Sequence, residues 1–158
     1  MSSLQKARSL RPWLVSVVVI RPGEMHSEIL LLKRVAKPAG VWCQVAGKIE
    51  PGETAWAAAL RELKEETGLS PLAFYNADTC EQFYEPWTDQ VVIAPVFVAI
   101  VPKDAEVRLN KEHSDYAWLS SEQAISRVSF PGQKRMLREV DLTFLQSNPD
   151  PLLQIPLS

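Results

Sequence analysis

The chain has 158 residues, 46% of them apolar and 23% charged, with a formal net charge of −2. This length fits one compact domain, and the apolar content is too high for a disordered chain. No apolar run approaches the roughly 20 residues of a membrane-spanning helix, and the slightly acidic balance argues against a general nucleic-acid binder. Cys43 and Cys80 form no CxxC pair, so we expect two reduced, buried thiols. The composition predicts a cytoplasmic protein without a membrane segment.

The first half of the chain is rich in strand-forming residues. Residues 14–21 are β-branched and almost continuously apolar, which predicts a strand that is covered on both faces. Residues 28–34 predict a second strand, and residues 41–49 an extended segment with a glycine near its end. Further strands are expected at residues 79–85, 91–101 and 115–119, followed by helical stretches at 120–127 and 131–146.

A central helix is predicted over residues 55–67, with Thr54 as its N-cap and Gly68 at the left-handed position after its last turn. Strands before and after such a helix indicate an α/β domain with a mixed sheet between helices. We treat residues 1–158 as one domain and expect residues 1–11 and 147–158 to be less ordered. The three prolines of the C-terminal tail exclude a helix and leave open an ordered strap or a frayed end.

The predicted helix carries an acidic stripe. At 100° per residue, Glu62, Glu65 and Glu66 fall within an arc of about 100°. An apolar group about 120° away is expected to face the core, namely Trp56, Ala59, Leu60 and Leu63. A solvated charged surface would explain the carboxylates alone. However, three like charges this close are destabilising unless a cation binds or some are protonated.

The segment before the helix adds to this picture. Gly47 ends a strand, and the following loop holds Glu50 and Glu53. Hard oxygen ligands at this density suit Mg²⁺ or Mn²⁺ rather than zinc. A carbonyl near Gly47 could join them, because glycine permits close approach of the backbone. The residues therefore predict a divalent-cation site at the junction of this loop and the helix.

Residues 47–69 resemble the Nudix box, G-x5-E-x7-R-E-U-x-E-E-x-G-U, in which U is aliphatic, and every specified position is filled. A chance match is on the order of one in a billion per starting position at average residue frequencies. The resemblance implies a Nudix-type α/β/α sandwich with a mixed central sheet, and hydrolysis of a nucleoside diphosphate linked to another moiety, with divalent cations. One departure is Ala46, where many members have glycine, although alanine still offers its carbonyl.

The resemblance also implies roles for individual residues. Glu62, Glu65 and Glu66 would bind the metal, Mg²⁺ or Mn²⁺, assisted by a carbonyl at Ala46 or Gly47. Glu53 would pair with Arg61 and tie the loop to the helix. The general base stays open between Glu62, Glu65 and an acid from a later loop, for which Glu112 is the candidate.

Phosphate and substrate contacts are less closely defined by the sequence. Arg34 and Lys48 point to one end of the sheet and are candidates for phosphate contacts, with solvated surface cations as the alternative. Trp42 could stack on a purine or pterin, and Gln44 could hydrogen-bond to its edge, although core packing would also explain the tryptophan.

Three functions follow from these patterns. Short segments around Trp42, Tyr116 and Phe130 are similar to the subgroup that hydrolyses dihydroneopterin triphosphate and dATP-like substrates, which predicts a pyrophosphohydrolase of a nucleoside or pterin triphosphate. The second is a Nudix hydrolase acting on ADP-ribose, a dinucleoside polyphosphate or an RNA 5′ end, and Tyr84 and Pro86 do not distinguish these. A sensor that binds a nucleotide without catalysis is the third, but all the acids of the box are present.

Many members of this family dimerise, so a homodimer stays open.

Overall fold

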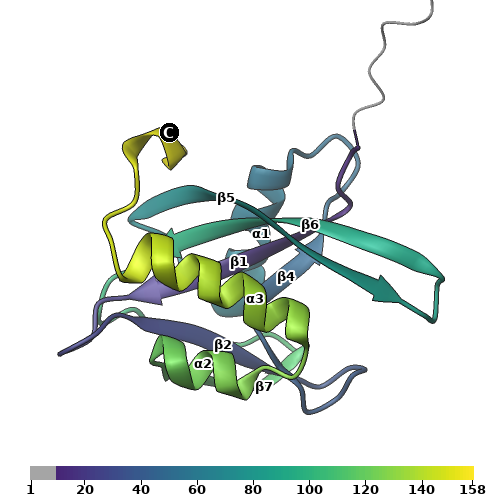
Figure 1. The fold of residues 1–158 in the computed structure, drawn as a ribbon, viewed down its shortest axis with the longest axis horizontal. Coiled ribbons are helices and arrows are strands. Elements are labelled where there is room, and N and C mark those ends of the chain that lie inside the picture. Colours follow the sequence, from purple (N-terminus) through teal and green to yellow (C-terminus); the bar gives the residue numbers. More distant parts are fainter. Residues whose placement is uncertain (1–9) are drawn as a thin grey trace, which may run out of the picture.

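The structure is a computed structural model that describes residues 10–158. Within this range a seven-stranded sheet lies between helices (Figure 1). The strands are β1 (Leu14–Arg21), β2 (Glu28–Arg34), β3 (Trp42–Cys43), β4 (Val45–Lys48), β5 (Ala73–Glu85), β6 (Gln90–Ile100) and β7 (His113–Leu119). The helices are α1 (Ala55–Thr67), α2 (Ser121–Arg127), α3 (Pro131–Val140), the π-helix η2 (Asp141–Leu145) and the 3₁₀-helix η3 (Pro151–Leu153). The predicted α/β architecture with a mixed sheet is confirmed.

The sheet divides at one end. β1 and β2 are paired only where Ile20 faces Ile29 and Arg21 faces Glu28, and β1 is parallel to β6. Beyond this junction β4 pairs with β1, whereas β3 and β7 pair with β2. The chain between β3 and β4 therefore crosses the split at Gln44. This split end carries the start of β1 and the ends of β2 and β4.

Two apolar cores lie on opposite faces of the sheet. The alternate side chains of β1 divide between them, with Val15, Val17 and Val19 facing α1 and Val18 and Ile20 facing α2 and α3. This alternation is the two-residue period of a strand, and it explains why the almost continuous apolar run forms a strand that is covered on both faces. The layers are α1 on one side, the sheet, and α2 with α3 on the other (Figure 1).

Several boundaries differ from the sequence predictions. The extended segment 41–49 forms two short strands interrupted at Gln44, because each half pairs with a different neighbour. β5 begins at Ala73 rather than at residue 79, and an irregularity between Asn76 and Cys80 separates its two halves. The sequence pattern did not predict the first half of the strand, because the polar residues of this irregularity interrupt the apolar alternation.

Two predictions of burial are wrong. Trp56, expected in the core, is 45% exposed, because it lies in the first turn of α1, beyond the buried residues Ala58, Ala59 and Leu63. Cys80, expected to be buried like Cys43, is exposed, because it lies on β5, the edge strand of the sheet. Edge strands leave one side uncovered, which sequence composition does not reveal.

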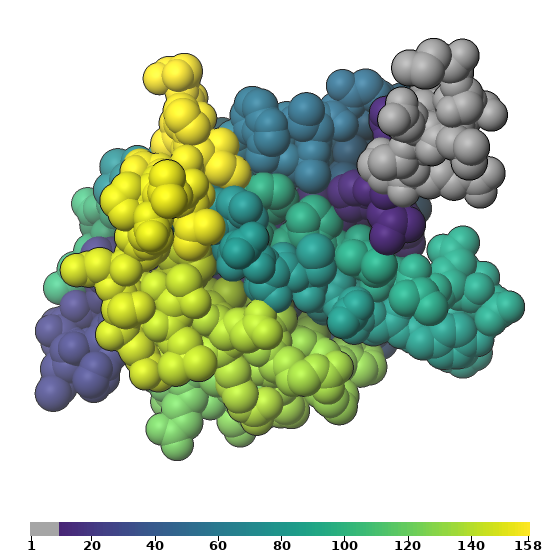
Figure 2. Space-filling view, turned by 45° about the horizontal axis from the view of Figure 1, so that its top comes forward, coloured from purple at the N-terminus to yellow at the C-terminus, as the bar shows by residue number. Residues whose placement is uncertain are grey.

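The C-terminal segment lies along β5. Gln154 forms a β-bridge with Tyr75, and the Ile155 N–H donates to the Phe74 carbonyl at 2.8 Å. Figure 2 shows this yellow segment against the body of the molecule. Residues 1–11 are predicted to be less ordered, and residues 1–9 of this range lie outside the residues that the structure describes. No helix within residues 10–158 is long and apolar enough to cross a membrane.

Candidate metal and phosphate site

The capped ends of α1 define where the helix begins and ends, and so the direction in which its acidic residues point. Thr54 Oγ1 accepts a hydrogen bond from the Ala57 N–H at 3.3 Å, and Gly68 ends the helix with φ +72° while donating its N–H to the Lys64 carbonyl. These are the N-cap and the left-handed terminus that the sequence predicts. Because Ala59 and Leu63 are fully buried, Glu62 and Glu66 on the neighbouring stripe are directed toward β4.

The three helix carboxylates differ strongly in exposure. Glu66 is 2% exposed, the Glu62 side chain is 13% exposed and the Glu65 side chain is 54% exposed. Glu66 Oε2 accepts a hydrogen bond from the Ala46 N–H at 3.3 Å, which connects the last turns of α1 to β4. The spacing predicted one shared stripe, and the structure divides it into a buried, a half-buried and an exposed carboxylate.

The backbone at Gly47 packs directly against the side chain of Glu62. A Cβ placed on Gly47 would overlap the carboxyl end of the Glu62 side chain. The glycine is therefore required by close approach of a strand backbone to a helix side chain, and its φ is not in the left-handed region. This contact brings the backbone of β4 next to the helix carboxylates, as expected for a loop carbonyl that assists in metal binding.

Arg61 connects the loop, the strand and the helix. Its Nε and Nη2 donate to the two oxygens of Glu53, both at 2.8 Å, which forms the ion pair that the sequence predicts. Nη2 also donates to the Lys48 carbonyl at 2.8 Å, and Nη1 donates to Glu62 at 2.8 Å and to Glu65 at 3.2 Å. A planar guanidinium provides these donors in fixed directions, which a lysine ammonium does not.

The ionisation of these acids follows from their surroundings. Burial, together with the nearby charges of Glu62 and Glu112, raises the pKa of Glu66 to about 9. Burial also raises the pKa of Glu62, against the opposing hydrogen bond from Arg61. The side-chain hydrogen bonds from Arg61 lower the pKa of Glu53 to about 2. Glu53 is therefore an anchored anion, whereas the positive charge of Arg34 offsets only part of the effect of burial on Glu66.

A second group of side chains faces Glu66 from β2 and β7. Arg34 and His113 are partners in the β2–β7 ladder, and ligand atoms of Glu66, Glu112 and His113 lie within 4.8 Å of one another. His113 was not among the predicted site residues, and its position directly after Glu112 was the available signal. Arg34 Nη2 donates to the Lys37 carbonyl at 3.1 Å, and its Nε is buried without a hydrogen-bond partner in the described part of the chain.

The residues predicted to contact the substrate are more dispersed. Lys48 is exposed at the end of β4, at the same split end of the sheet as Arg34. Trp42 is half-buried, with the Arg127 guanidinium 5.0 Å from its ring centroid. Gln44 is 2% exposed, and its hydrogen bonds go to other protein groups. The structure thus brings Arg34 and Lys48 to the end of the sheet where the carboxylates lie, whereas Gln44 is enclosed among protein side chains and Trp42 is half-buried next to Arg127.

The partners of Gln44 form a buried polar network that the sequence did not predict. Ser16 Oγ donates to Glu81 Oε2 at 2.6 Å, and Gln44 Nε2 donates to the same oxygen at 2.8 Å. Gln133 Nε2 donates to Gln44 Oε1 at 3.2 Å. Ser16 and Glu81 are 65 positions apart, so no local pattern could indicate their contact. Burial raises the pKa of Glu81, against the hydrogen bonds from Ser16 and Gln44.

The residues present fit a hard divalent cation. The carboxylates of Glu62 and Glu112 are close enough to Glu66 to raise its pKa, in addition to the effect of its burial. A buried carboxylate beside two like charges is unfavourable, and a bound cation would reduce this cost. Carboxylate and backbone oxygens are the donors that Mg²⁺ and Mn²⁺ use in proteins.

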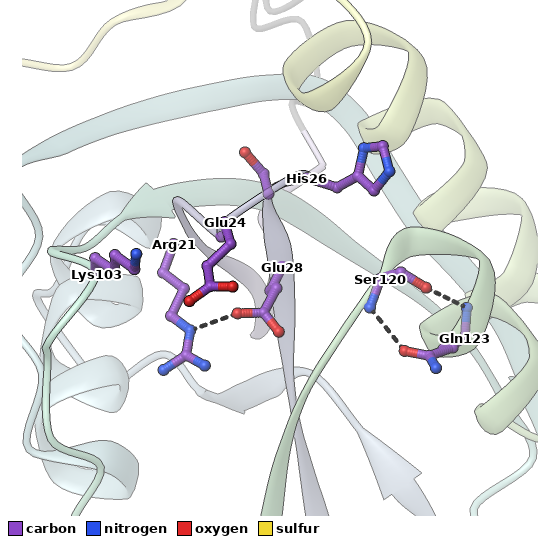
Figure 3. Close-up of a pocket in the computed structure, with 9 residues that line it drawn as sticks. Arg21, Glu24, His26, Glu28, Lys103, Ser120 and Gln123 are labelled. Atoms are coloured by element: carbon purple, nitrogen blue, oxygen red, sulfur yellow. Dashed lines mark hydrogen bonds and ion pairs between the residues drawn. The ribbon is translucent and has the colours of Figure 1, made fainter.

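A separate hollow of about 450 Å³ lies at the opposite end of the sheet (Figure 3). Arg21 and Glu28 form an ion pair of 2.9 Å in it, and Ser120 and Gln123 hydrogen-bond to each other. Its other lining residues include both signs of charge, Glu24 and Lys103. These internal pairings give the hollow no evident ligand, and none of its lining residues belongs to the box.

Comparison with known proteins identifies the family. The model of the NUDIX domain matches residues 11–140. The bis(5′-nucleosyl)-tetraphosphatase [asymmetrical] of Sus scrofa is 32% identical over 100 residues, which are 62% of this chain and 68% of that protein. An octanoyltransferase of Myxococcus xanthus is 34% identical over 125 residues, 78% of this chain, but the chain spans only 35% of that relative.

Solved structures agree with this assignment. A C. elegans Ap4A hydrolase binary complex superposes with a TM-score of 0.73 at 25% identity, over 83% of this chain and 96% of that one. The E. coli dihydroneopterin triphosphate pyrophosphohydrolase gives a TM-score of 0.70 at 22% identity, over 82% and 94%, which shows a shared fold. The α/β/α layers and the box around Glu62 define a Nudix fold. This chain belongs to the NUDIX family, as its sequence predicts.

Proposed function

We propose that this protein is a hydrolase that uses Mg²⁺ or Mn²⁺ to cleave a phosphoanhydride bond in a nucleoside diphosphate derivative. The observation that carries the proposal is the contact of Glu62 and Glu66 with the β4 backbone, with Arg61 hydrogen-bonded to Glu62 and Glu65. A substrate with several phosphate charges is repelled by such a site in the absence of a cation. When bound, the cation supplies charge neutralisation, polarises a phosphoryl oxygen and lowers the pKa of a coordinated water.

The chain's own residues have separable roles in this proposal. Glu62 and Glu66 hold the cation with a carbonyl of Ala46 or Gly47, because they are the carboxylates nearest to the β4 backbone. Arg61, anchored by Glu53, positions Glu62 and Glu65. Arg34 and Lys48 contact the substrate phosphates from the same end of the sheet.

The general base must be accessible to the attacking water. Glu66 is 2% exposed and the Glu62 side chain 13% exposed, whereas the side chains of Glu65 and Glu112 are exposed. We therefore assign the base to one of these two exposed carboxylates. The comparison of Glu65→Gln with Glu112→Gln decides between them, because loss of the base lowers kcat and removes the acidic limb of the pH profile.

For the substrate, we propose a dinucleoside polyphosphate. The supporting observation is the similarity to bis(5′-nucleosyl)-tetraphosphatases, which includes 32% identity to the pig protein and the superposition with the Ap4A hydrolase. A nucleoside or pterin triphosphate, which the sequence favours, is the second candidate. Its recognition was expected to involve Trp42 and Gln44, but Arg127 stacks on the first, and the second is buried and hydrogen-bonded.

A substrate panel with Mg²⁺ or Mn²⁺ tests this proposal. The substrates are dinucleoside tetraphosphate, dihydroneopterin triphosphate, dNTPs, ADP-ribose and 5′-triphosphate RNA. Asymmetrical cleavage of the tetraphosphate to a nucleoside triphosphate and a monophosphate is expected to be the fastest reaction. Pyrophosphate release from the pterin or dATP at a higher kcat/KM would instead support the second candidate, and AMP from ADP-ribose would overturn both.

The metal site is tested separately with Glu62→Gln, Glu65→Gln and Glu66→Gln at saturating Mg²⁺. The matched control is Lys64→Gln, on the same helix, because within residues 10–158 its ammonium hydrogen-bonds only to Gly68 and Ser70. We expect each carboxylate substitution to lower turnover and the control to leave it unchanged. Unchanged turnover in all three carboxylate variants would rule out the proposed metal site.

A further inference from the structure

His113 is a buried histidine with an unsatisfied ring nitrogen. The residue is 7% exposed, and its Nδ1 is buried without a hydrogen-bond partner among residues 10–158. A histidine in a protein core normally uses both ring nitrogens, one as donor and one as acceptor. The packing of β7 against β2 thus leaves a nitrogen lone pair or N–H without a partner, and this requires an explanation.

The surroundings of His113 point to a cation. A ligand atom of His113 lies within 4.8 Å of ligand atoms of Glu66 and Glu112. Donors bound to one ion at about 2.1 Å lie about 3 to 4.2 Å apart, so small side-chain rotations would bring these three atoms to a shared ion. The neighbouring cation, Arg34, is directed to the Lys37 carbonyl through Nη2 at 3.1 Å.

We propose that His113 binds the catalytic cation together with Glu66 and Glu112, and that this nitrogen ligand makes the site prefer Mn²⁺ or a later divalent transition metal to Mg²⁺. The inference rests on the proposed function and specifies which metal it uses. An oxygen-only donor set suits Mg²⁺, whereas imidazole suits transition metals, whose affinity increases along the series from Mn²⁺ to Cu²⁺. If Glu112 is a ligand, Glu65 is the remaining exposed carboxylate for the general base.

Nitrogen coordination can be observed without measuring activity. Pulsed electron paramagnetic resonance of Mn²⁺ bound to the protein detects a directly coordinated ¹⁴N nucleus. The chain has two histidines, His26 and His113, and His26 is exposed in the hollow at the opposite end of the sheet. Replacement of His26 by Asn leaves His113 as the sole histidine. In this variant, ¹⁵N-labelled histidine assigns any coupling to His113.

The expected result is a ¹⁴N coupling typical of bound imidazole in the wild type and in His26→Asn, which changes to the ¹⁵N pattern on labelling. His113→Asn is expected to lose the coupling and to lower the ratio of Mn²⁺ to Mg²⁺ affinity by about tenfold. The spectra of the labelled and unlabelled His26→Asn protein decide the question even if His113→Asn does not fold.

Two negative results have different meanings. If Mn²⁺ binds and hydrolysis depends on it, but no directly bound nitrogen is detected, the assignment of His113 is wrong and the proposed function stands. If neither Mn²⁺ nor Mg²⁺ binds and hydrolysis requires no metal, the proposed function itself fails, and the inference fails with it.

Discussion

Gly47 and Glu62 are in such close contact that the β4 backbone and the α1 carboxylate leave no space for a Cβ. The contact joins the strand that offers a carbonyl to the helix that offers the acids. The effect of adding a side chain at Gly47 therefore tests directly whether this contact positions the site.

Gly47→Ala is expected to lower turnover by about 100-fold or more, because the added methyl displaces Glu62 or the β4 backbone from the metal site. Kinetics at saturating Mg²⁺, with thermal unfolding in parallel, separate this effect from loss of fold. Gly132→Ala is the control, since its Cβ would meet the Gln82 carbonyl at 3.3 Å, outside the site. Turnover of Gly47→Ala close to that of the control would contradict the proposed arrangement.

Arg61→Lys is expected to lower kcat by roughly 10- to 100-fold, although it preserves the charge. Lysine can contact Glu53 but cannot also donate to the Lys48 carbonyl and to Glu62 in fixed directions. Steady-state kinetics measure the loss, and Lys64→Arg on the same helix is the matched control. A kcat within twofold of the wild type would show that the multiple hydrogen bonds of Arg61 do not contribute to the reaction.

The sequence predicted those parts of the site that are contiguous in the chain. The helical spacing specifies the acidic stripe that includes Glu62, and the resemblance to the Nudix box implies the ion pair of Glu53 with Arg61. The different burial of Glu66 and Glu65 could not be predicted, because it depends on how α1 packs on the sheet.

The remaining features depend on contacts between distant segments. His113 faces Arg34 through the β2–β7 register, and Glu81 on β5 reaches Ser16 on β1 across the intervening strand β6. The sequence predicted that Trp42 could stack on a substrate base. The contact of its ring with Arg127 could not be predicted, because Arg127 lies on a helix 85 positions later in the chain. Such pairings arise from strand order, which local patterns do not encode.

Glu81 is expected to make the stability of the protein depend on pH. Burial raises its pKa above the ordinary value of 4.5, so the folded protein holds this proton more tightly than the unfolded chain. The free energy of unfolding is therefore expected to decrease as the pH rises above 4.5, by at most about 1.4 kcal/mol per pH unit.

Glu81→Gln tests this dependence, because glutamine cannot ionise and its amide oxygen can still accept from Ser16 and Gln44. Denaturant unfolding from pH 5 to pH 9 at fixed Mg²⁺ is expected to show a shallower decrease in the variant than in the wild type. The exposed Glu139→Gln serves as the control. Parallel pH profiles for wild type and Glu81→Gln would show that Glu81 ionises alike in both states.

Trp42 and Trp87 are expected to respond oppositely to substitution. Trp42 is half-buried and covered by Arg127, so Trp42→Leu is expected to lower the free energy of unfolding by about 1–2 kcal/mol, with KM unchanged. Trp87 is 90% exposed, so Trp87→Ser is expected to change the free energy of unfolding by less than about 0.5 kcal/mol.

The place of Trp87 gives it a different role from Trp42. It lies at the tip of the β5–β6 hairpin, which protrudes from the body of the molecule in both views (Figures 1 and 2). The β1–β6 and β1–β4 registers place this tip at the same end of the sheet as Lys48. If Trp87 stacks on the second nucleoside of a dinucleoside polyphosphate, its loss raises KM for that substrate about 5-fold or more and leaves KM for nucleoside triphosphates unchanged. Equal KM changes for both substrates would contradict this selective contact.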